Sequence, residues 1–287
     1  MSRHAETGVI HDIGYQHYSG PRLGRGYVAR SMYVHSLRTA YGLGRSARTK
    51  FLPVGLFGLA CVAGLILVVV NTLSPVPVIS YVGAVGAFSY AAAVFVAVVG
   101  PELVSRDLRN NLLSMYFSRP MTRIDYALTK LAALATAVFV LLTGPVLIMY
   151  LGAVFSGKNG FTGFADQTGH FFLGLLAAAI HSIVLAALAV PLASLTGRRV
   201  FATGMIIALF LLTEPITGVL SKIGTGSLSD LAGLFNPSSL LNGVDRWLFG
   251  DGTVSVGSFG PVYGLVAVAV TAAGVGLSIL RYRTVKS

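Results

Sequence analysis

Side chains that could do chemistry are few in this 287-residue chain, which has ten Asp and Glu, six His and one Cys. These carboxylates and imidazoles form no nucleophile–base pair and no set with metal-ligand spacing. The segment from Gly152 to Asn159 approximates a phosphate-binding loop, but Asn159 stands where a Ser or Thr would hold magnesium. The segment also follows an apolar run, not a strand. We therefore expect no catalytic site, cofactor, metal or nucleotide site, and no enzyme activity.

The densest charge pattern lies in residues 101–126, and it predicts an amphipathic helix. One face of this helix would be apolar and carry Val104, Leu108, Leu112 and Met115. Another face would be charged and carry Glu102, Arg106 and Arg109. The helix should end before Arg119-Pro120, because the residue before a proline avoids the helical region. Such an element, over 102–118, is suited to binding a partner. The alternative is a solvated connecting loop.

The next helix would begin with a capping box. Thr122 and Asp125 have the Thr-x-x-acid spacing in which each side chain bonds the other residue's backbone. Arg123 and Lys130 then lead into an apolar run.

Two further ionisable residues interrupt apolar runs. His181 lies near the middle of one run, where an ionisable group is a functional hypothesis by default. The alternative is a neutral imidazole bonded to a neighbouring helix. Glu214 precedes Pro215, which would allow a helix kink. This carboxylate belongs either to a transport pathway or hinge, or to an outer interface facing water.

These side chains must be positioned by membrane helices. With 54% hydrophobic residues, 11% charged residues and a mean hydropathy of +0.76, the chain is too apolar for a soluble domain of this length. About 20 mainly apolar residues cross a bilayer as a helix. We predict an all-α integral membrane protein with six spans, at residues 51–70, 79–100, 127–154, 171–195, 200–220 and 261–280.

Basic residues fall in alternate gaps between these runs. All but Lys158, Lys222 and Arg246 of the 21 Lys and Arg residues lie on one predicted side. Cytoplasmic loops retain Lys and Arg, so we expect a multi-pass protein of the cell inner (plasma) membrane with both termini cytoplasmic. The net charge of +11 then reflects orientation and contact with anionic lipid, not nucleic acid. Outside residues 101–126 we expect this charge to set topology only.

Two flanking regions complete the predicted organisation. Residues 1–50 form a cytoplasmic segment, in which 27–41 place Val34, Leu37 and Tyr41 on one stripe of an interfacial helix ended by Gly42 and Gly44. The alternative is an unstructured basic leader. Residues 51–287 form the membrane domain. Its last outer loop, 221–260, holds two apolar segments, 228–235 and 238–249, that are too short to span and would lie on or dip into the outer face.

The run from Glu102 through Leu112-Leu113-Ser114 and Arg119-Pro120-Met121-Thr122-Arg123 to Lys130 resembles the loop between spans two and three of type-2 ATP-binding-cassette export permeases. Asn236-Pro237-Ser238 also resembles a turn of that family. The resemblance in layout covers nearly the whole chain, whereas the local motif is degenerate. It implies that 101–126 is a coupling loop that docks on an ATPase through Glu102, Arg106, Asp107, Arg109, Leu112, Met115, Arg119 and Arg123.

The resemblance implies a permease subunit of an exporter, paired with a second identical or related permease subunit and with separate ATPase chains. The cargo would be hydrophobic or amphipathic: a drug, a lipid-linked molecule or a peptide. His181 and Glu214 are the candidate pathway residues. A membrane sensor or immunity subunit shares this architecture. An ion-coupled carrier would instead need several buried, paired charges.

Overall fold

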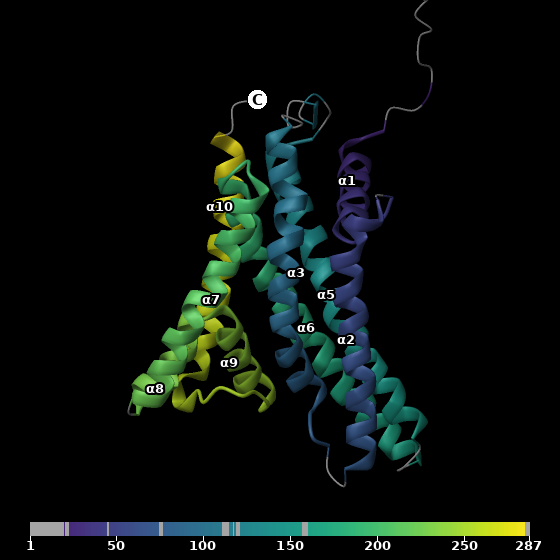
Figure 1. Ribbon diagram of the computed structural model, residues 1–287, viewed down its shortest axis with the longest axis vertical. Coiled ribbons are helices and arrows are strands. Elements are labelled where there is room, and N and C mark those ends of the chain that lie inside the picture. Colours follow the sequence, from purple (N-terminus) through teal and green to yellow (C-terminus); the bar gives the residue numbers. More distant parts are fainter. Residues whose placement is uncertain are drawn as a thin grey trace, which may run out of the picture.

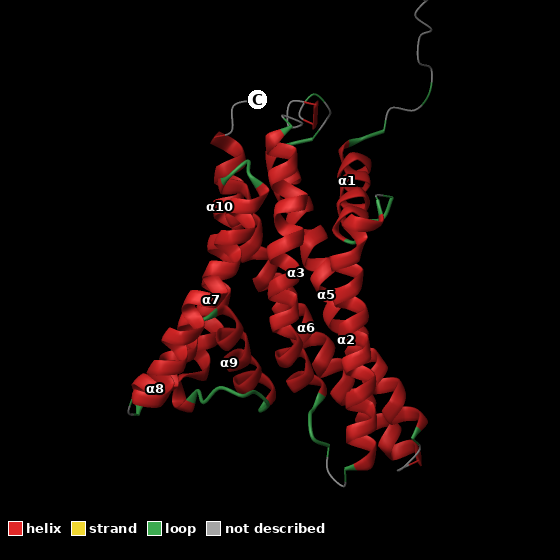
Figure 2. Cartoon of the chain, viewed as in Figure 1, coloured by secondary structure: helices red, strands yellow, loops and turns green. Residues whose placement is uncertain are grey.

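The computed structural model describes residues 20, 23–44, 46–74, 77–110, 115–116, 118, 121–156, 160–224 and 226–284. Every regular element in these residues is a helix (Figures 1 and 2). In chain order they are α1 (Arg25–Ala40), α2 (Ala47–Leu73), α3 (Tyr81–Arg109), α5 (Arg123–Phe155), α6 (Gly160–Leu195), α7 (Arg199–Ile223), α8 (Ser227–Leu231), η1 (Ala232–Phe235), α9 (Pro237–Phe249), η2 (Gly257–Phe259) and α10 (Gly260–Thr284).

Six helices of the described chain are long and apolar enough to cross a membrane: α2, α3, α5, α6, α7 and α10. The predicted all-α class and the number of spans are therefore confirmed, and the architecture is that of a multi-pass membrane protein. The helices run past most predicted ends. Apolar composition locates the part of a helix that suits hydrocarbon, while packing and caps decide where the helix stops.

The largest difference from prediction concerns α3. A new helix was expected to start after Gly100, but α3 continues through Pro101 to Arg109. Proline removes one backbone hydrogen bond from a helix interior. Here the next turn is held by tertiary contacts, because Leu103 and Val104 are almost wholly buried and Ser105 Oγ donates to a carbonyl of α6. The charged residues that follow Pro101 therefore extend a spanning helix.

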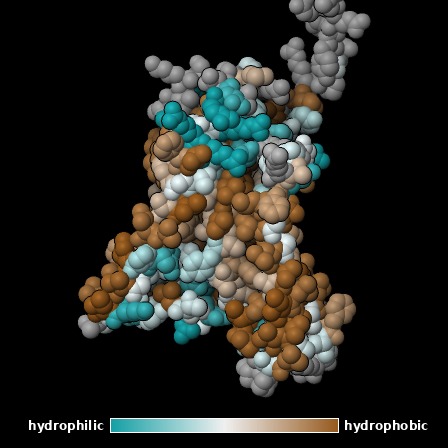
Figure 3. Space-filling model, in the orientation of Figure 1, coloured by the Kyte–Doolittle hydropathy of each residue, from teal (hydrophilic) through white to brown (hydrophobic). Residues whose placement is uncertain are grey.

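Three helices form the core of the bundle. In the most apolar windows of α3, α5 and α6, 61%, 50% and 61% of the residues are buried, against 17%, 17% and 22% in α2, α7 and α10. The outer three therefore present apolar side chains on the surface, and Figure 3 shows this apolar band below a hydrophilic end. In a membrane protein that surface meets lipid or another subunit, so exposure here has a different meaning than in a soluble domain.

The N-terminal helix lies along α5. Tyr33 donates to Thr136 at 2.9 Å and Tyr41 to the carbonyl of Ala137 at 2.7 Å. Its buried face includes Met32 and Ser36, whereas Val34, which the sequence placed on the apolar stripe, is exposed. The predicted helix is thus confirmed, and of the predicted stripe Leu37 and Tyr41 pack against the core whereas Val34 does not. It ends at a turn in which Gly42 and Gly44 have positive φ, as their positions suggested.

Short helices fill the loop between α7 and α10. The predicted segments 228–235 and 238–249 correspond to α8 with η1 and to α9. Asn236 caps α9 by accepting from the backbone N–H of Ser238 and Ser239, and its amide donates to the Phe210 carbonyl on α7. Figure 1 shows these helices at the end opposite the C-terminus and α1. α9 packs against α10, α3 and α6.

We expect close contact of α10 with α6 to require glycine at 274. A Cβ added to Gly274 would clash with the carbonyl oxygen of Ala187 on α6. Gly274→Val should therefore lower the unfolding free energy by about 1–3 kcal/mol, the usual cost of overpacking. Thermal unfolding in detergent measures this. The matched control is Gly276→Val, because a Cβ there meets nothing within 4 Å; equal losses in the two variants would contradict the packing argument.

Candidate functional site

The predicted docking residues lie at the end of the bundle that carries the C-terminus and α1 (Figure 1). Glu102, Arg106, Asp107 and Arg109 occupy the last turns of α3, and Arg123 is the first residue of α5. Met115 lies in the connection between these helices and is 65% exposed. Leu112 and Arg119 fall outside the described residues. We call the described part of this region the inner cluster: Glu102, Arg106, Asp107, Arg109, Met115, Arg123 and the residues that they contact.

Glu102 joins two helices of the inner cluster. One carboxylate oxygen contacts Nη1 of Arg199, the first residue of α7, at 2.8 Å. The other contacts Nη1 of Arg106 on its own helix at 3.5 Å, the predicted i,i+4 pair. Only 13% of the Glu102 side chain is exposed. The pair with Arg199 is short and partly desolvated, so it ties the C-terminal end of α3 to the start of α7 more firmly than an open surface pair would.

Asp107 forms the buried part of the inner cluster. Its Oδ2 accepts a hydrogen bond from the Tyr126 hydroxyl at 2.8 Å and lies 2.8 Å from Nζ of Lys130. Lys130 is 4% exposed, and Tyr126 packs edge-on against Tyr282 of α10 at a centroid distance of 4.9 Å. Asp107 is therefore directed into the bundle, where it links α3 to α5. Through this link it holds the last turn of α3, which carries the exposed Arg109, against α5.

The first turn of α5 collects contacts from both ends of the chain. The predicted capping box between Thr122 and Asp125 is present. The same Asp125 carboxylate binds Arg25 of α1 through two bonds of 2.6 Å, and this hydrogen bonding raises the pKa of Arg25. Arg123 donates to the Arg283 carbonyl at the end of α10 at 2.6 Å. These contacts complete a polar layer that connects α1, α3, α5, α7 and α10.

A second ionisable pair lies within the bundle. Nε2 of His181 on α6 is 2.8 Å from Oδ2 of Asp245 on α9, with exposed side-chain fractions of 0% and 1%. A contact of this kind needs one proton between the two atoms, because an ionised carboxylate only accepts. His181 Nδ1 and Asp245 Oδ1 are also buried and have no hydrogen-bond partner among the described residues. Buried polar atoms are seldom left unpaired, which makes this pair a candidate functional site.

Glu214 lies elsewhere, on a face shared by α7 and α3. Its carboxylate is 3.5 Å from the hydroxyl of Tyr90, and both residues are exposed. It precedes the end of α7 at Ile223 by about two and a half turns, so it lies within the apolar helix and not at its edge. His181 and Glu214, predicted as pathway residues, therefore do not lie together. His181 is enclosed in the bundle, whereas Glu214 faces outward.

Sequence reasoning missed Asp245, the partner of His181. It lies in a segment that the sequence assigned to the outer loop, apart from the apolar run that contains His181. The spacing of Ser238, Asn242 and Asp245, which share one side of a helix, could have given a signal. All three are buried. Among the described residues no group of three His, Cys, Asp or Glu could hold a metal ion.

No protein-family model matches the sequence, and comparison with curated proteins gives no significant match. The functional argument therefore rests on the residues and contacts described above.

We expect Lys130→Met to destabilise the protein by about 3 kcal/mol or more, because it leaves the Asp107 carboxylate buried without its cation. Thermal unfolding in detergent tests this. The double variant Asp107→Asn/Lys130→Met should recover much of the loss, since it removes the stranded charge. Arg106→Gln should cost less than about 1 kcal/mol, because the Arg106 side chain is 45% exposed. A Lys130→Met loss no larger than that of Arg106→Gln would be inconsistent with a buried ion pair.

Proposed function

We propose that this chain is the membrane-spanning permease subunit of an ATP-driven exporter and works with separate ATP-binding-cassette ATPase subunits. The observation that carries the proposal is the inner cluster: a polar layer that joins the ends of α1, α3, α5, α7 and α10 beneath an exposed Arg109 and Met115. A membrane subunit without a nucleotide site must receive work through such a contact surface.

The geometry of α3 suits force transmission. It is one continuous helix from Tyr81 to Arg109, so a load on its last turn acts on the whole length of the spanning segment. The pairs of Glu102 with Arg199 and of Asp107 with Lys130 pass that load to α7 and α5. Rigid-body movement of packed helices is a common form of switching transition.

The proposed orientation places the inner cluster in the cytoplasm of a cell with an inner (plasma) membrane. The positive-inside bias of the sequence supports it, and both described chain ends lie at that end of the bundle (Figure 1). Anionic lipid head groups would contact the remaining basic side chains. In this orientation α8, η1 and α9 would belong to the outer half, and the packing of α9 against α3, α6 and α10 supports a re-entrant position for it.

A second permease subunit, identical or related, is part of the proposal. Glu214 supports it, because a carboxylate exposed on the side of an apolar helix is costly against lipid tails. Apolar neighbours on α7, including Leu211 and Leu212, are also exposed. A face that combines such residues with Glu214 and Tyr90 suits a subunit contact or a water-filled pathway better than lipid. The cargo is the hydrophobic or amphipathic class named above.

A second candidate function, an ion-coupled carrier, is favoured by one observation. Such a carrier needs paired ionisable groups inside the bundle, and His181 with Asp245 is such a pair. A proton-coupled mechanism would use a histidine and a carboxylate in contact of this kind to accept and release a proton.

For the exporter we expect a change of charge at the exposed surface to weaken coupling. Arg109→Glu and Met115→Asp, in the chain purified with its ATPase, should lower transport-stimulated ATP hydrolysis by about tenfold, since a hydrogen-bonded interface contact to a charge is worth about 1.4 kcal/mol or more. Both side chains are exposed, so folding should be retained. The matched control is Lys222→Glu, an exposed charge at the other end of the bundle. Unchanged assembly and hydrolysis in both surface variants would exclude docking here.

Reconstituted vesicles separate the two functions. We expect uptake into inside-out vesicles to require ATP and the ATPase, and to continue when an ionophore collapses the proton gradient. In the His181→Gln and Asp245→Asn variants, ATP-driven uptake should likewise continue when the ionophore is present. Uptake that is driven by a proton gradient alone, and that these two variants lose, would replace the exporter with the carrier.

A further inference from the structure

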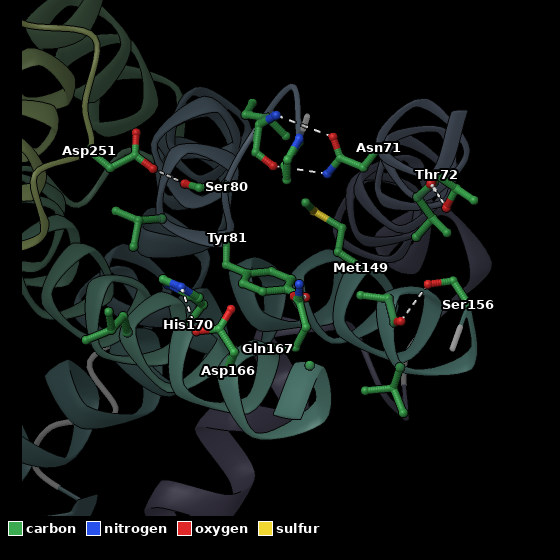
Figure 4. Close-up of a pocket in the computed structure, with 18 of the residues that line it drawn as sticks. Asn71, Thr72, Ser80, Tyr81, Met149, Ser156, Asp166, Gln167, His170 and Asp251 are labelled. Carbon is green, nitrogen blue, oxygen red and sulfur yellow. Dashed lines mark hydrogen bonds and ion pairs between the residues drawn. The ribbon is translucent and has the colours of Figure 1, made fainter. Parts of the chain in front are cut away.

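A cavity of about 570 Å³ opens at the outer end of the bundle, far along the helices from the inner cluster. It lies between the C-terminal turns of α2 and α5 and the N-terminal turns of α3 and α6 (Figure 4). Neither proposed function makes use of it. Its volume lies in the range of pockets that hold drug-sized ligands.

The walls of the cavity are braced by hydrogen bonds. Asn71 at the end of α2 clamps the following connection: its amide donates to the Ile79 carbonyl at 3.0 Å and its oxygen accepts from the Val78 N–H at 2.9 Å. On the opposite wall the Tyr81 hydroxyl donates to Gln167 at 2.7 Å. Figure 4 shows the hydroxyl end of the Tyr81 ring directed toward Gln167. A pocket with walls held in this way is largely formed before any ligand arrives.

Aromatic packing supports the same wall. The ring of Tyr81 meets Phe171 edge-on, and Phe171 stacks on Tyr150 at a centroid distance of 4.5 Å. The Tyr150 hydroxyl in turn shares a 3.0 Å hydrogen bond with Thr168. Tyr81 is thus held by Phe171 as well as through its hydroxyl, and because it is buried it braces the cavity wall from within.

The lining divides into an apolar part and an acidic part. The apolar part includes Val68, Val82, Met149, Ala153 and Leu173. The acidic part consists of Asp166, whose side chain is 72% exposed and 3.6 Å from His170, and Asp251, which accepts from Ser80. No Lys or Arg is present among the described lining residues. The two carboxylates come from α6 and from the segment after α9, and Figure 4 shows them apart from one another. Carboxylates beside an apolar lining complement an amphiphile whose head group is positive.

We propose that this cavity binds an amphipathic molecule with a protonated amine, with the amine in the acidic part of the lining and the apolar body against the apolar part. The binding step needs neither ATP nor a partner chain, so it goes beyond the proposed transport function and does not depend on it. Two sources share this chemistry: a soluble cationic amphiphile, and the amine head group of a membrane lipid.

The test uses the purified full chain in micelles of an uncharged detergent. The probe is a dansyl-labelled long-chain alkyl ammonium, compared with an alkyl sulfate of equal chain length and the same label. We expect saturable binding of the ammonium probe and an affinity for the sulfate probe that is at least about tenfold lower. The reason is that partly exposed carboxylates attract the ammonium and repel the sulfate. Equal affinity for the two probes, or no saturable binding of the ammonium, overturns the proposal.

Variants locate the probe. Asp166→Asn with Asp251→Asn should weaken ammonium binding by about tenfold, since the amides keep the size and the Ser80 bond but not the charge. Ala153→Phe should block binding by filling the apolar part. The matched control is Asp230→Asn, at the same end of the bundle but outside the lining; an equal loss in this control would place the probe elsewhere and overturn the assignment.

Mass spectrometry of the purified protein distinguishes the two sources. An amine lipid that is retained by the wild type and lost from the double Asp→Asn variant identifies the lipid head group as the ligand. Saturable probe binding by protein that retains no such lipid identifies the soluble amphiphile.

Discussion

The structure depends on one constraint: a polar group surrounded by hydrocarbon must find its partner within the protein. The long helices meet it for the backbone. For side chains it is met by pairing between helices, as with Asp107 and Lys130. The buried side-chain atoms that lack a partner in the described chain are Ser36 Oγ, His181 Nδ1, Ser238 Oγ, Asp245 Oδ1 and Tyr282 Oη. Two of these five atoms belong to the His181–Asp245 pair, so the constraint is least well met at a buried ionisable pair.

The basic residues at the inner end have a second effect beyond orientation. The sequence suggested that, outside residues 101–126, positive charge set topology only. That interpretation is wrong for three arginines: Arg25 binds Asp125, Arg199 binds Glu102, and Arg281 donates to the Ser194 carbonyl at 3.2 Å. Arginine suits this position because its planar group bonds carboxylates and helix-end carbonyls together. These arginines fasten the helix ends to one another.

Features that depend on residues close together in the sequence were predicted, whereas features that depend on contacts between distant residues were not. The six spans and the Thr122–Asp125 cap depend on residues near one another in sequence, and both were predicted. The continuation of α3 through Pro101 was not, because it depends on packing against α6. Asp245 was missed for a related reason. Segment composition shows that α9 is too short to span, but its depth is set by the helices that surround it, and no local pattern contains that information.

The helix α6 connects the two candidate sites. Near its middle, His181 holds α9, and at its inner end the carbonyls of Ala193 and Ser194 accept from Ser105 of α3 and Arg281 of α10. These contacts are made by one helix without a break from Gly160 to Leu195. Pro191 lies between these two sets of contacts and removes one backbone hydrogen bond from α6, so displacement of the helix end at Ala193 reaches His181 through a turn that can bend. The end of the bundle beside the inner cluster and the buried pair are therefore joined by one helix, although they share no side chain.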